Sequence, residues 1–171
     1  MHVNYFLKST RLGFRCWRPE DLPLALELWG DPEVNAFIGG HFTPEMVRAR
    51  LASEIEQMKE FGVQYWPLFL LEDDQHVGCA GLRPYRIEQQ VYELGFHLRP
   101  MFWRRGLAKE AGCTVIDYAF RKLNAKALFA GHHPLNEASR QLLLKLGFIY
   151  THEERYPPTG LMNPSYLLRR T

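Results

Sequence analysis

Hydrophobic and polar residues alternate along RLGFRCW, residues 11–17, as they do in a strand with one buried face. A short helix is expected from about Pro19 to the stop signal at Gly30. After Thr43 and Pro44, typical of an N-cap and a first helical position, apolar residues recur at helical spacing as far as Gly62. This predicted helix has an apolar stripe of Val47, Leu51, Ile55 and Met58. Its charged residues are expected to face solvent: Arg48, Arg50, Glu54 and Lys59.

The rest of the chain alternates strand and helix patterns. Three strand-like runs, residues 65–72, 76–85 and 91–98, have short polar connections and predict a meander. Apolar residues at i, i+4 spacing predict a helix over 105–123. The short apolar run 127–131 fits a buried strand. Another helix is predicted to begin after Asn136 and to end before Gly147. Residues 148–156 and 165–170 are typical of closing strands. The order β-α-α-β-β-β-α-β-α-β-β predicts a mixed α/β sheet covered by helices, in a single domain over residues 1–171.

Composition narrows the class of protein. The formal charge of +2 gives no electrostatic case for nucleic acid or a membrane as partner. Cys16, Cys79 and Cys113 are scattered, so they show no paired zinc spacing and no metal is expected. Their odd number, with no secretion signal and no apolar run of ~20 residues, favours reduced thiols in a cytoplasmic protein.

One junction suggests a ligand. PMFWRRGLAKEA, residues 100–111, follows a predicted strand and opens a predicted helix. A helix start has backbone N–H groups without intrahelical partners and a partial positive charge, so with Arg104 and Arg105 beside it this end suits phosphate or pyrophosphate. Gly106 lets the backbone approach such a group closely. A basic helix cap with nothing bound is the alternative. A P-loop is excluded because GxxxxGK[ST] is absent.

The succession ELGFHLRPMFWRRGLAKEA, followed by NEASRQLLLKLGF, resembles the GNAT superfamily of acyl-coenzyme A-dependent N-acetyltransferases. TRLGFRCWRPEDL and WGDPEV are similar to openings in its ribosomal-protein N-terminal (alanine/serine) acetyltransferase branch. The resemblance covers Thr10 to about Tyr166. It implies a GNAT fold: a mixed, mostly antiparallel sheet of about seven strands, a splay between the fourth and fifth strands, and about four flanking helices.

The resemblance also implies a cosubstrate, acetyl-CoA, and residues that bind it. The family pattern Q/R-x-x-G-x-G/A, whose backbone amides bind the CoA pyrophosphate, falls on Trp103, Arg104, Arg105, Gly106, Leu107 and Ala108. Trp103 departs from the usual Gln or Arg, and one of the two arginines could compensate. Phe96, His97 and Leu98 occupy the strand that pairs with the pantetheine arm, and Asn136 matches an asparagine beside it. A helix N-cap alone is the other role for Asn136.

Acetyl transfer to an amine needs a neutral nucleophile and a proton for the leaving thiolate. Deprotonating a lysine at pH 7 costs ~4.6 kcal/mol and an α-amine ~1.4 kcal/mol, so α-amines are the easier acceptors. Glu93 matches a family glutamate and is the leading candidate for the general base, unless it is an outward-facing or salt-bridged residue. His132 and His133 are weaker candidates. The family's acid, a tyrosine seven residues after the asparagine, is replaced by Leu143, so the acid is unassigned.

We therefore expect an acetyl-CoA-dependent N-acetyltransferase that acts on a primary amine through a ternary complex. The acceptor is a protein N-terminus or a small molecule such as an aminoglycoside or polyamine. Its site is expected among aromatic residues, which could equally belong to the core: Trp29, Phe37, Tyr65, Tyr85 and Tyr156. Glu45, Glu54, Glu56, Glu153 and Glu154 could attract a cation or merely be solvated. A non-catalytic acyl-CoA-binding or sensor protein is the alternative function, and both monomer and homodimer are open.

Overall fold

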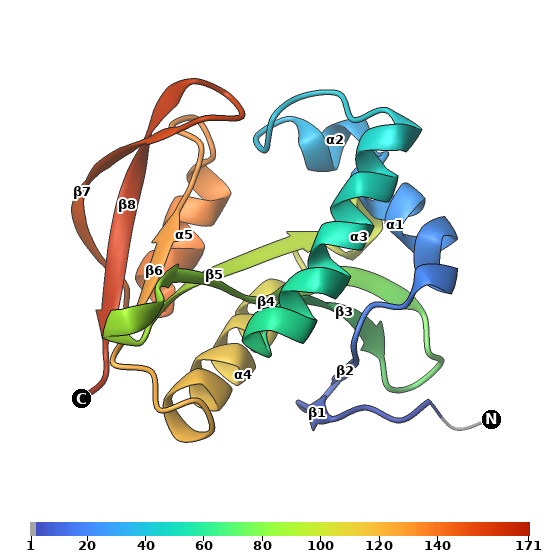
Figure 1. Ribbon diagram of the computed structural model, residues 1–171, viewed down its shortest axis with the longest axis horizontal. Coiled ribbons are helices and arrows are strands. Elements are labelled where there is room, and N and C mark those ends of the chain that lie inside the picture. The colour runs from blue at the N-terminus through green and yellow to red at the C-terminus, as the bar shows by residue number, and fades with distance from the viewer. Residues whose placement is uncertain (1–2) are drawn as a thin grey trace.

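The computed structural model describes residues 3–171, which form five α-helices and one eight-stranded sheet (Figure 1). The helices are α1 (Leu22–Trp29), α2 (Pro32–Asn35), α3 (Pro44–Phe61), α4 (Leu107–Arg121) and α5 (Glu137–Lys145). The strands are β1 (Leu7–Lys8), β2 (Leu12–Phe14), β3 (Tyr65–Leu70), β4 (His76–Arg86), β5 (Val91–Leu98), β6 (Ala127–Gly131), β7 (Ile149–Tyr156) and β8 (Leu161–Arg169). The predicted mixed α/β sheet is confirmed. One strand more than expected arises because Leu7–Lys8 pairs with β2.

The strand order is β1-β2-β3-β4-β5-β6-β8-β7, and only β5 and β6 pair in parallel. Their pairing is short, since it joins Val91–Glu93 to Ala127–Phe129. β5 continues along β4 as far as Leu98, which lies opposite Gly78. The edge of β5 toward β6 is therefore unpaired after Glu93. This is the predicted splay between residues 91–98 and 127–131.

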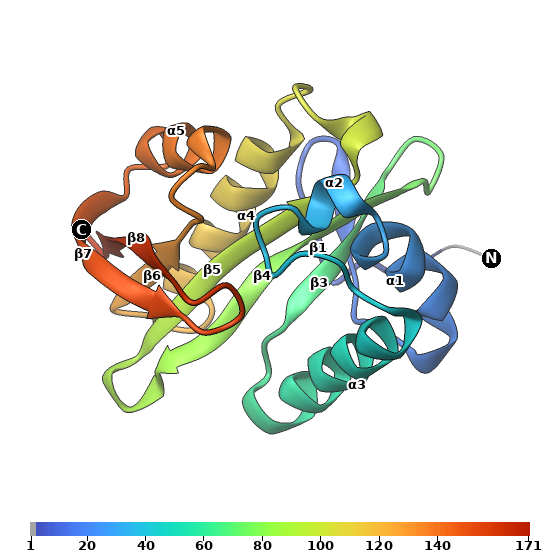
Figure 2. The same cartoon turned by 90° about the horizontal axis from the view of Figure 1, so that it is seen from above.

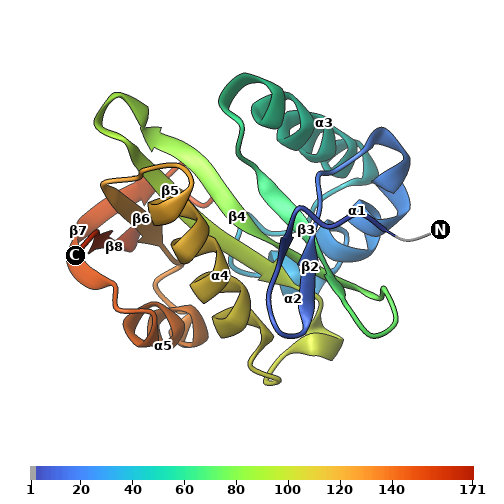
Figure 3. The same ribbon diagram turned by 90° about the horizontal axis from the view of Figure 1, so that it is seen from below.

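Helices cover both faces of the sheet. Figure 2 shows the strands running between α1 and α3 on one side and α4 and α5 on the other, and Figure 3 shows α4 across the strands from below. The larger apolar core joins α4 to the sheet through residues such as Leu107, Val115 and Trp66. A second core joins α1 and α3 to the opposite face through Leu28 and Leu51. Because side chains alternate along each strand, the two cores use alternate strand residues.

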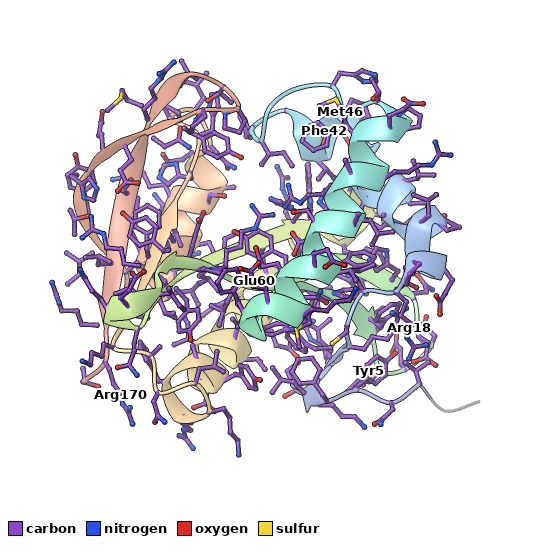
Figure 4. All side chains as sticks on the ribbon, in the orientation of Figure 1. Tyr5, Arg18, Phe42, Met46, Glu60 and Arg170 are labelled. Carbon is purple, nitrogen blue, oxygen red and sulfur yellow. The ribbon has the colours of Figure 1, made fainter. Side chains whose placement is uncertain are left out.

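The local signals that begin and end α3 are confirmed, but two of its charged residues do not face solvent. The Thr43 side chain accepts a hydrogen bond from the Met46 N–H at the N-cap, and Gly62 ends the helix in the left-handed conformation at φ 71°. Figure 4 places Phe42 and Met46 at the start of α3 and Glu60 toward its other end. The expectation that Glu54 and Arg50 face solvent is wrong, because their side chains are 1% and 17% exposed. Glu54 lies two helical turns after Val47 and therefore on the same buried side.

Across residues 3–171, no helix combines the length and the apolar character needed to cross a membrane.

Candidate active site

The turn before α4 is held in a conformation that exposes its backbone. Residues 103–106 are solvent-exposed, and Gly106 has a left-handed φ of 74°. The first helical hydrogen bond that reaches back to Gly106 comes from the Glu110 N–H, at 3.1 Å. The N–H groups of Leu107, Ala108 and Lys109 thus lack intrahelical acceptors and point out of the helix start. This geometry suits an anion.

Trp103 has a structural role in the same turn. Its indole N–H donates to the Leu98 carbonyl at 2.7 Å, so it ties the turn to the end of β5. Arg104 adopts a left-handed φ of 58°, which is uncommon for a side chain other than glycine. The Arg105 guanidinium lies 5.5 Å from the centre of the Phe102 ring. Both arginines therefore belong to an exposed turn that Trp103 ties to β5.

Arg11, before β2, anchors the turn from a distant part of the chain. Its Nε donates to Glu110 Oε2 at 2.7 Å, and its Nη1 donates to the Arg105 carbonyl at 3.0 Å. The Ser9 hydroxyl donates to Glu110 Oε1 at 2.6 Å. Burial opposes but does not outweigh these hydrogen bonds, which hold the pKa of Glu110 below its ordinary value. No local pattern predicted this clamp, since its two ends lie 99 residues apart.

Along β5, Glu93, Gly95 and His97 lie on the face covered by α1 and α3. Tyr65 on β3 reaches across β4 to this row. A Cβ atom built on Gly95 would lie 2.1 Å from the Tyr65 hydroxyl oxygen, so only glycine leaves room for it. The Tyr65 hydroxyl thus lies over β5 between Glu93 and His97, where the splay begins. Sequence analysis placed Tyr65 only among the possible aromatic residues of the acceptor site. Gly95, the glycine in ELGF, was the signal that could have predicted this close approach.

Burial shifts the pKa values of Glu93, His97 and the neighbouring Tyr65. It raises the pKa of Glu93, while the charge of Arg83 acts in the opposite direction. Burial, reinforced by Arg50 and Arg83, lowers the pKa of His97 well below its ordinary value. Because Trp29 Nε1 donates to His97 Nδ1 at 3.1 Å, the neutral imidazole carries its proton on Nε2. Burial also raises the pKa of Tyr65 well above its usual range, so the phenol is protonated at neutral pH.

A partly buried ionic cluster of Arg50, Glu54 and Arg83 lies beside this row. Glu54 Oε1 accepts from Arg50 Nε at 3.2 Å and from Arg83 Nη2 at 2.7 Å, while Oε2 accepts from the Tyr65 N–H at 2.9 Å. The Arg83 guanidinium lies 4.2 Å from the centre of the Tyr65 ring, and that of Arg50 lies 4.8 Å from the Trp29 ring. Sequence analysis assigned none of these roles, because they depend on contacts between α3 and β4.

The other sequence candidates lie around the end of β6. His132 is buried, with Nδ1 2.8 Å from the His133 carbonyl and Nε2 3.1 Å from the Tyr166 hydroxyl. Because a carbonyl only accepts, Nδ1 carries the proton and Nε2 is the acceptor. The His133 ring lies 4.9 Å from that of Phe37, and its Nδ1 accepts from the Leu135 N–H. The Asn136 side chain caps α5 by accepting from the Ser139 N–H at 3.1 Å.

The remaining aromatic and acidic candidates divide between the core and the edge of the sheet. Trp29 and Tyr65 belong to the core on the α3 side, and Tyr85 stacks on Phe129 with ring centres 4.0 Å apart. The Tyr85 hydroxyl donates to Glu154, which also contacts His152. Tyr156 is near the central row, because the charges of Arg50, Arg83 and Glu93 all act on its pKa, which burial raises. Glu45 and Glu56 are exposed on α3.

Comparisons with solved structures agree with this architecture. An acetyltransferase of the GNAT family from Bacillus anthracis has a TM-score of 0.78 at 24% identity, covering 94% of this chain and 95% of that chain. An acetyltransferase from Agrobacterium tumefaciens has a TM-score of 0.81 at 22% identity, covering 99% of each chain. The ribosomal L7/L12 α-N-protein acetyltransferase RimL has a TM-score of 0.84 at 13% identity, covering 99% and 96%. At these identities the likeness shows the fold.

Sequence comparison extends to the family. The uncharacterized N-acetyltransferase p20 of Bacillus licheniformis is 28% identical over 146 residues, which is 83% of this chain and 81% of that protein. The N-acetyltransferase YnaD of Bacillus subtilis, also uncharacterized, is 26% identical over 148 residues, 86% of this chain and 82% of that protein. A family model described as the acetyltransferase (GNAT) domain matches residues 11–149. Since that match spans most of the chain, the protein is an acetyltransferase that belongs to the GNAT family.

Proposed function

We propose that this acetyltransferase moves the acetyl group of acetyl-CoA directly to a primary amine, in a ternary complex formed over Glu93 at the splay of β5 and β6. The observation that carries the proposal is the meeting of two features at β5. The exposed N–H groups of the α4 turn suit a pyrophosphate. Trp103 ties this turn to Leu98, at the end of the strand edge that a pantetheine arm would follow.

The residues of the turn fit the phosphate part of the cosubstrate. Its open N–H groups come from Leu107, Ala108 and Lys109, and Gly106 presents no side chain to an incoming phosphate. Related geometry supports this assignment, because RimL, at a TM-score of 0.80 and 13% identity, is known in complex with coenzyme A. Beyond the turn, the β5 edge along Phe96, His97 and Leu98 is proposed to offer backbone groups to the pantetheine amides, apart from the Leu98 carbonyl, which Trp103 already engages. Asn136 is proposed to border the same slot while it caps α5.

Glu93 is proposed as the general base. Its half-buried carboxyl lies beside the splay, and its raised pKa makes it a stronger proton acceptor than an ordinary glutamate. His132 is less suited, because its acceptor nitrogen already contacts the Tyr166 hydroxyl. The Nδ1 of His133 is similarly engaged by the Leu135 N–H.

The proposed transfer begins with the amine and ends with the free thiol of CoA. The amine nitrogen forms a bond to the acetyl carbonyl carbon while Glu93 accepts its proton, directly or through one water. The carbon–sulfur bond breaks and the sulfur leaves with the electron pair. We propose the Tyr65 hydroxyl, over Gly95, as the donor that hydrogen-bonds this sulfur and protonates it. Tyr65 would therefore fill the role that Leu143 cannot.

The test combines binding with turnover. Calorimetric titration with acetyl-CoA, with ATP as control, is expected to show micromolar binding of acetyl-CoA alone. Release of free CoA thiol is then followed with a panel of primary amines, using wild type and Glu93→Gln. Amine-dependent thiol release that falls at least roughly 10²-fold in the variant supports the proposal. Binding without turnover of any amine would support a non-catalytic acyl-CoA-binding protein instead.

A further inference from the structure

We propose that the acceptor amine carries a carboxylate on the same small molecule, and that Arg50 and Arg83 bind this carboxylate. The acceptor class is then an amino acid or a close derivative. This inference rests on the proposed function and specifies its substrate. The amine would lie at Glu93 and the carboxylate at the two guanidinium groups.

The first observation is a charge imbalance within the ionic cluster of Arg50, Glu54 and Arg83. It contains two guanidinium groups but one carboxylate. Both oxygens of Glu54 are already engaged, Oε1 by the two arginines and Oε2 by the Tyr65 N–H. Glu54 therefore balances one of the positive charges. Glu93 acts on both arginines through its charge, but within residues 3–171 no hydrogen bond joins its carboxyl to either guanidinium group. A second carboxylate would complete it.

The second observation is an unused donor. Within residues 3–171, Arg50 Nη2 is buried and has no hydrogen-bond partner. A buried polar group in that state is unfavourable, and a charged acceptor relieves it best. The Arg50 guanidinium lies over the Trp29 ring and that of Arg83 over the Tyr65 ring, so cation–π contacts help to hold both groups in place. The planar edge of a guanidinium group suits a carboxylate.

The third observation is the position of the cluster relative to the reacting groups. Arg83 on β4 is the cross-strand partner of Glu93 on β5. Tyr65, which Arg83 covers, has its hydroxyl over Gly95. The Arg83 side chain is 30% exposed and that of Arg50 is 17% exposed, so the cluster borders accessible space. An amine and a carboxylate within one small molecule can thus contact both sites.

The same charges disfavour other acceptors. A polyamine or an aminoglycoside would bring further positive charges toward two guanidinium groups, which repel them. The first residue of a protein chain has a neutral peptide carbonyl where a free amino acid has a carboxylate. Polyamines, aminoglycosides and protein N-termini therefore all lack the carboxylate that Arg50 and Arg83 are proposed to bind.

The experiment compares matched amines. A pool of free amino acids, the corresponding pool of amino acid amides, and a pool of polyamines and aminoglycosides are each incubated with acetyl-CoA and the wild-type enzyme. Acetylated products are measured by mass spectrometry. We expect at least one free amino acid to react roughly 10- to 100-fold faster than its amide, the loss expected for one charge-assisted interaction. The amide has the less basic amine, so amine ionisation works against this preference.

Variants then locate the preference. For the best amino acid, the ratio of kcat/KM between acid and amide is measured in Arg83→Gln, in Arg50→Gln and, as control, in Arg86→Gln at the exposed end of β4. This ratio does not depend on the fraction of enzyme that is folded. We expect it to fall to about one or below in Arg83→Gln and in Arg50→Gln, because amine ionisation then favours the amide, and to stay unchanged in the control.

The outcomes separate the two proposals. Equal rates for acids and amides, or a preference for polyamines or aminoglycosides, would overturn the carboxylate assignment while amine acetylation itself stands. A wild-type acid preference that survives in both cluster variants would also overturn the assignment to Arg50 and Arg83. Acetyl-CoA binding with no acetylation of any pool would overturn both.

Discussion

Replacing Glu54 by glutamine is expected to destabilise the fold by about 3–5 kcal/mol, the range for removing one partner of a buried ion pair. The Glu54 side chain is 1% exposed and holds Arg50, Arg83 and the Tyr65 N–H at distances of 2.7–3.2 Å. Glutamine keeps the size and one carbonyl acceptor. It leaves two partly buried guanidinium groups without a negative charge and places an amide donor against them.

The measurement is the free energy of unfolding from urea denaturation, checked by the thermal midpoint. For a chain of this length each kcal/mol corresponds to roughly 2–4 °C, so the midpoint should fall by roughly 6–20 °C. Glu56→Gln is the matched control on the same helix. Its side chain is 69% exposed and, among residues 3–171, pairs with Lys59 alone, so its effect should stay below about 0.5 kcal/mol. If Glu54→Gln lowers the free energy of unfolding by less than about 1 kcal/mol, water screens the charges of the cluster. The argument that Arg50 and Arg83 need a second carboxylate then fails.

Three further changes test the site. Gly106→Val should weaken acetyl-CoA binding in calorimetry, because valine disfavours φ 74° and blocks the approach of the phosphates to the backbone. Gly160→Val, at φ 72° in the β7–β8 turn, should bind normally, and equal affinity in both variants would refute the assignment of the turn before α4 to the pyrophosphate. Tyr65→Phe should lower kcat roughly 10²-fold with acetyl-CoA affinity unchanged, whereas an unchanged kcat removes Tyr65 as proton donor. With a weakly basic amine as acceptor, the wild-type rate should fall as pH drops through the raised pKa of Glu93; a Glu93→Gln profile with the same acidic limb assigns that limb to another group.

Local signals in the sequence determined most of the elements. Thr43 with Pro44, the apolar spacing of α4 and the cap at Asn136 each act within a few residues, so the helices they begin could be predicted. The turn before α4 was predictable for the same reason, because Gly106 and the first helical N–H groups lie within one short segment. The splay between β5 and β6 was expected from the family resemblance and not from a local pattern.

The tertiary structure alone decided which distant residues meet. Glu54 was placed on the wrong side because charge was weighed above helical geometry, and its partner Arg83 lies 29 residues away on another element. Arg11 reaches Glu110 across 99 residues, and Tyr65 reaches Gly95 only because β4 brings β3 and β5 together. No periodic pattern encodes such contacts, since they depend on packing between elements. The backbone positions of the proposed CoA site could therefore be predicted from the sequence. The side chains proposed to select the acceptor could be identified only from the tertiary structure.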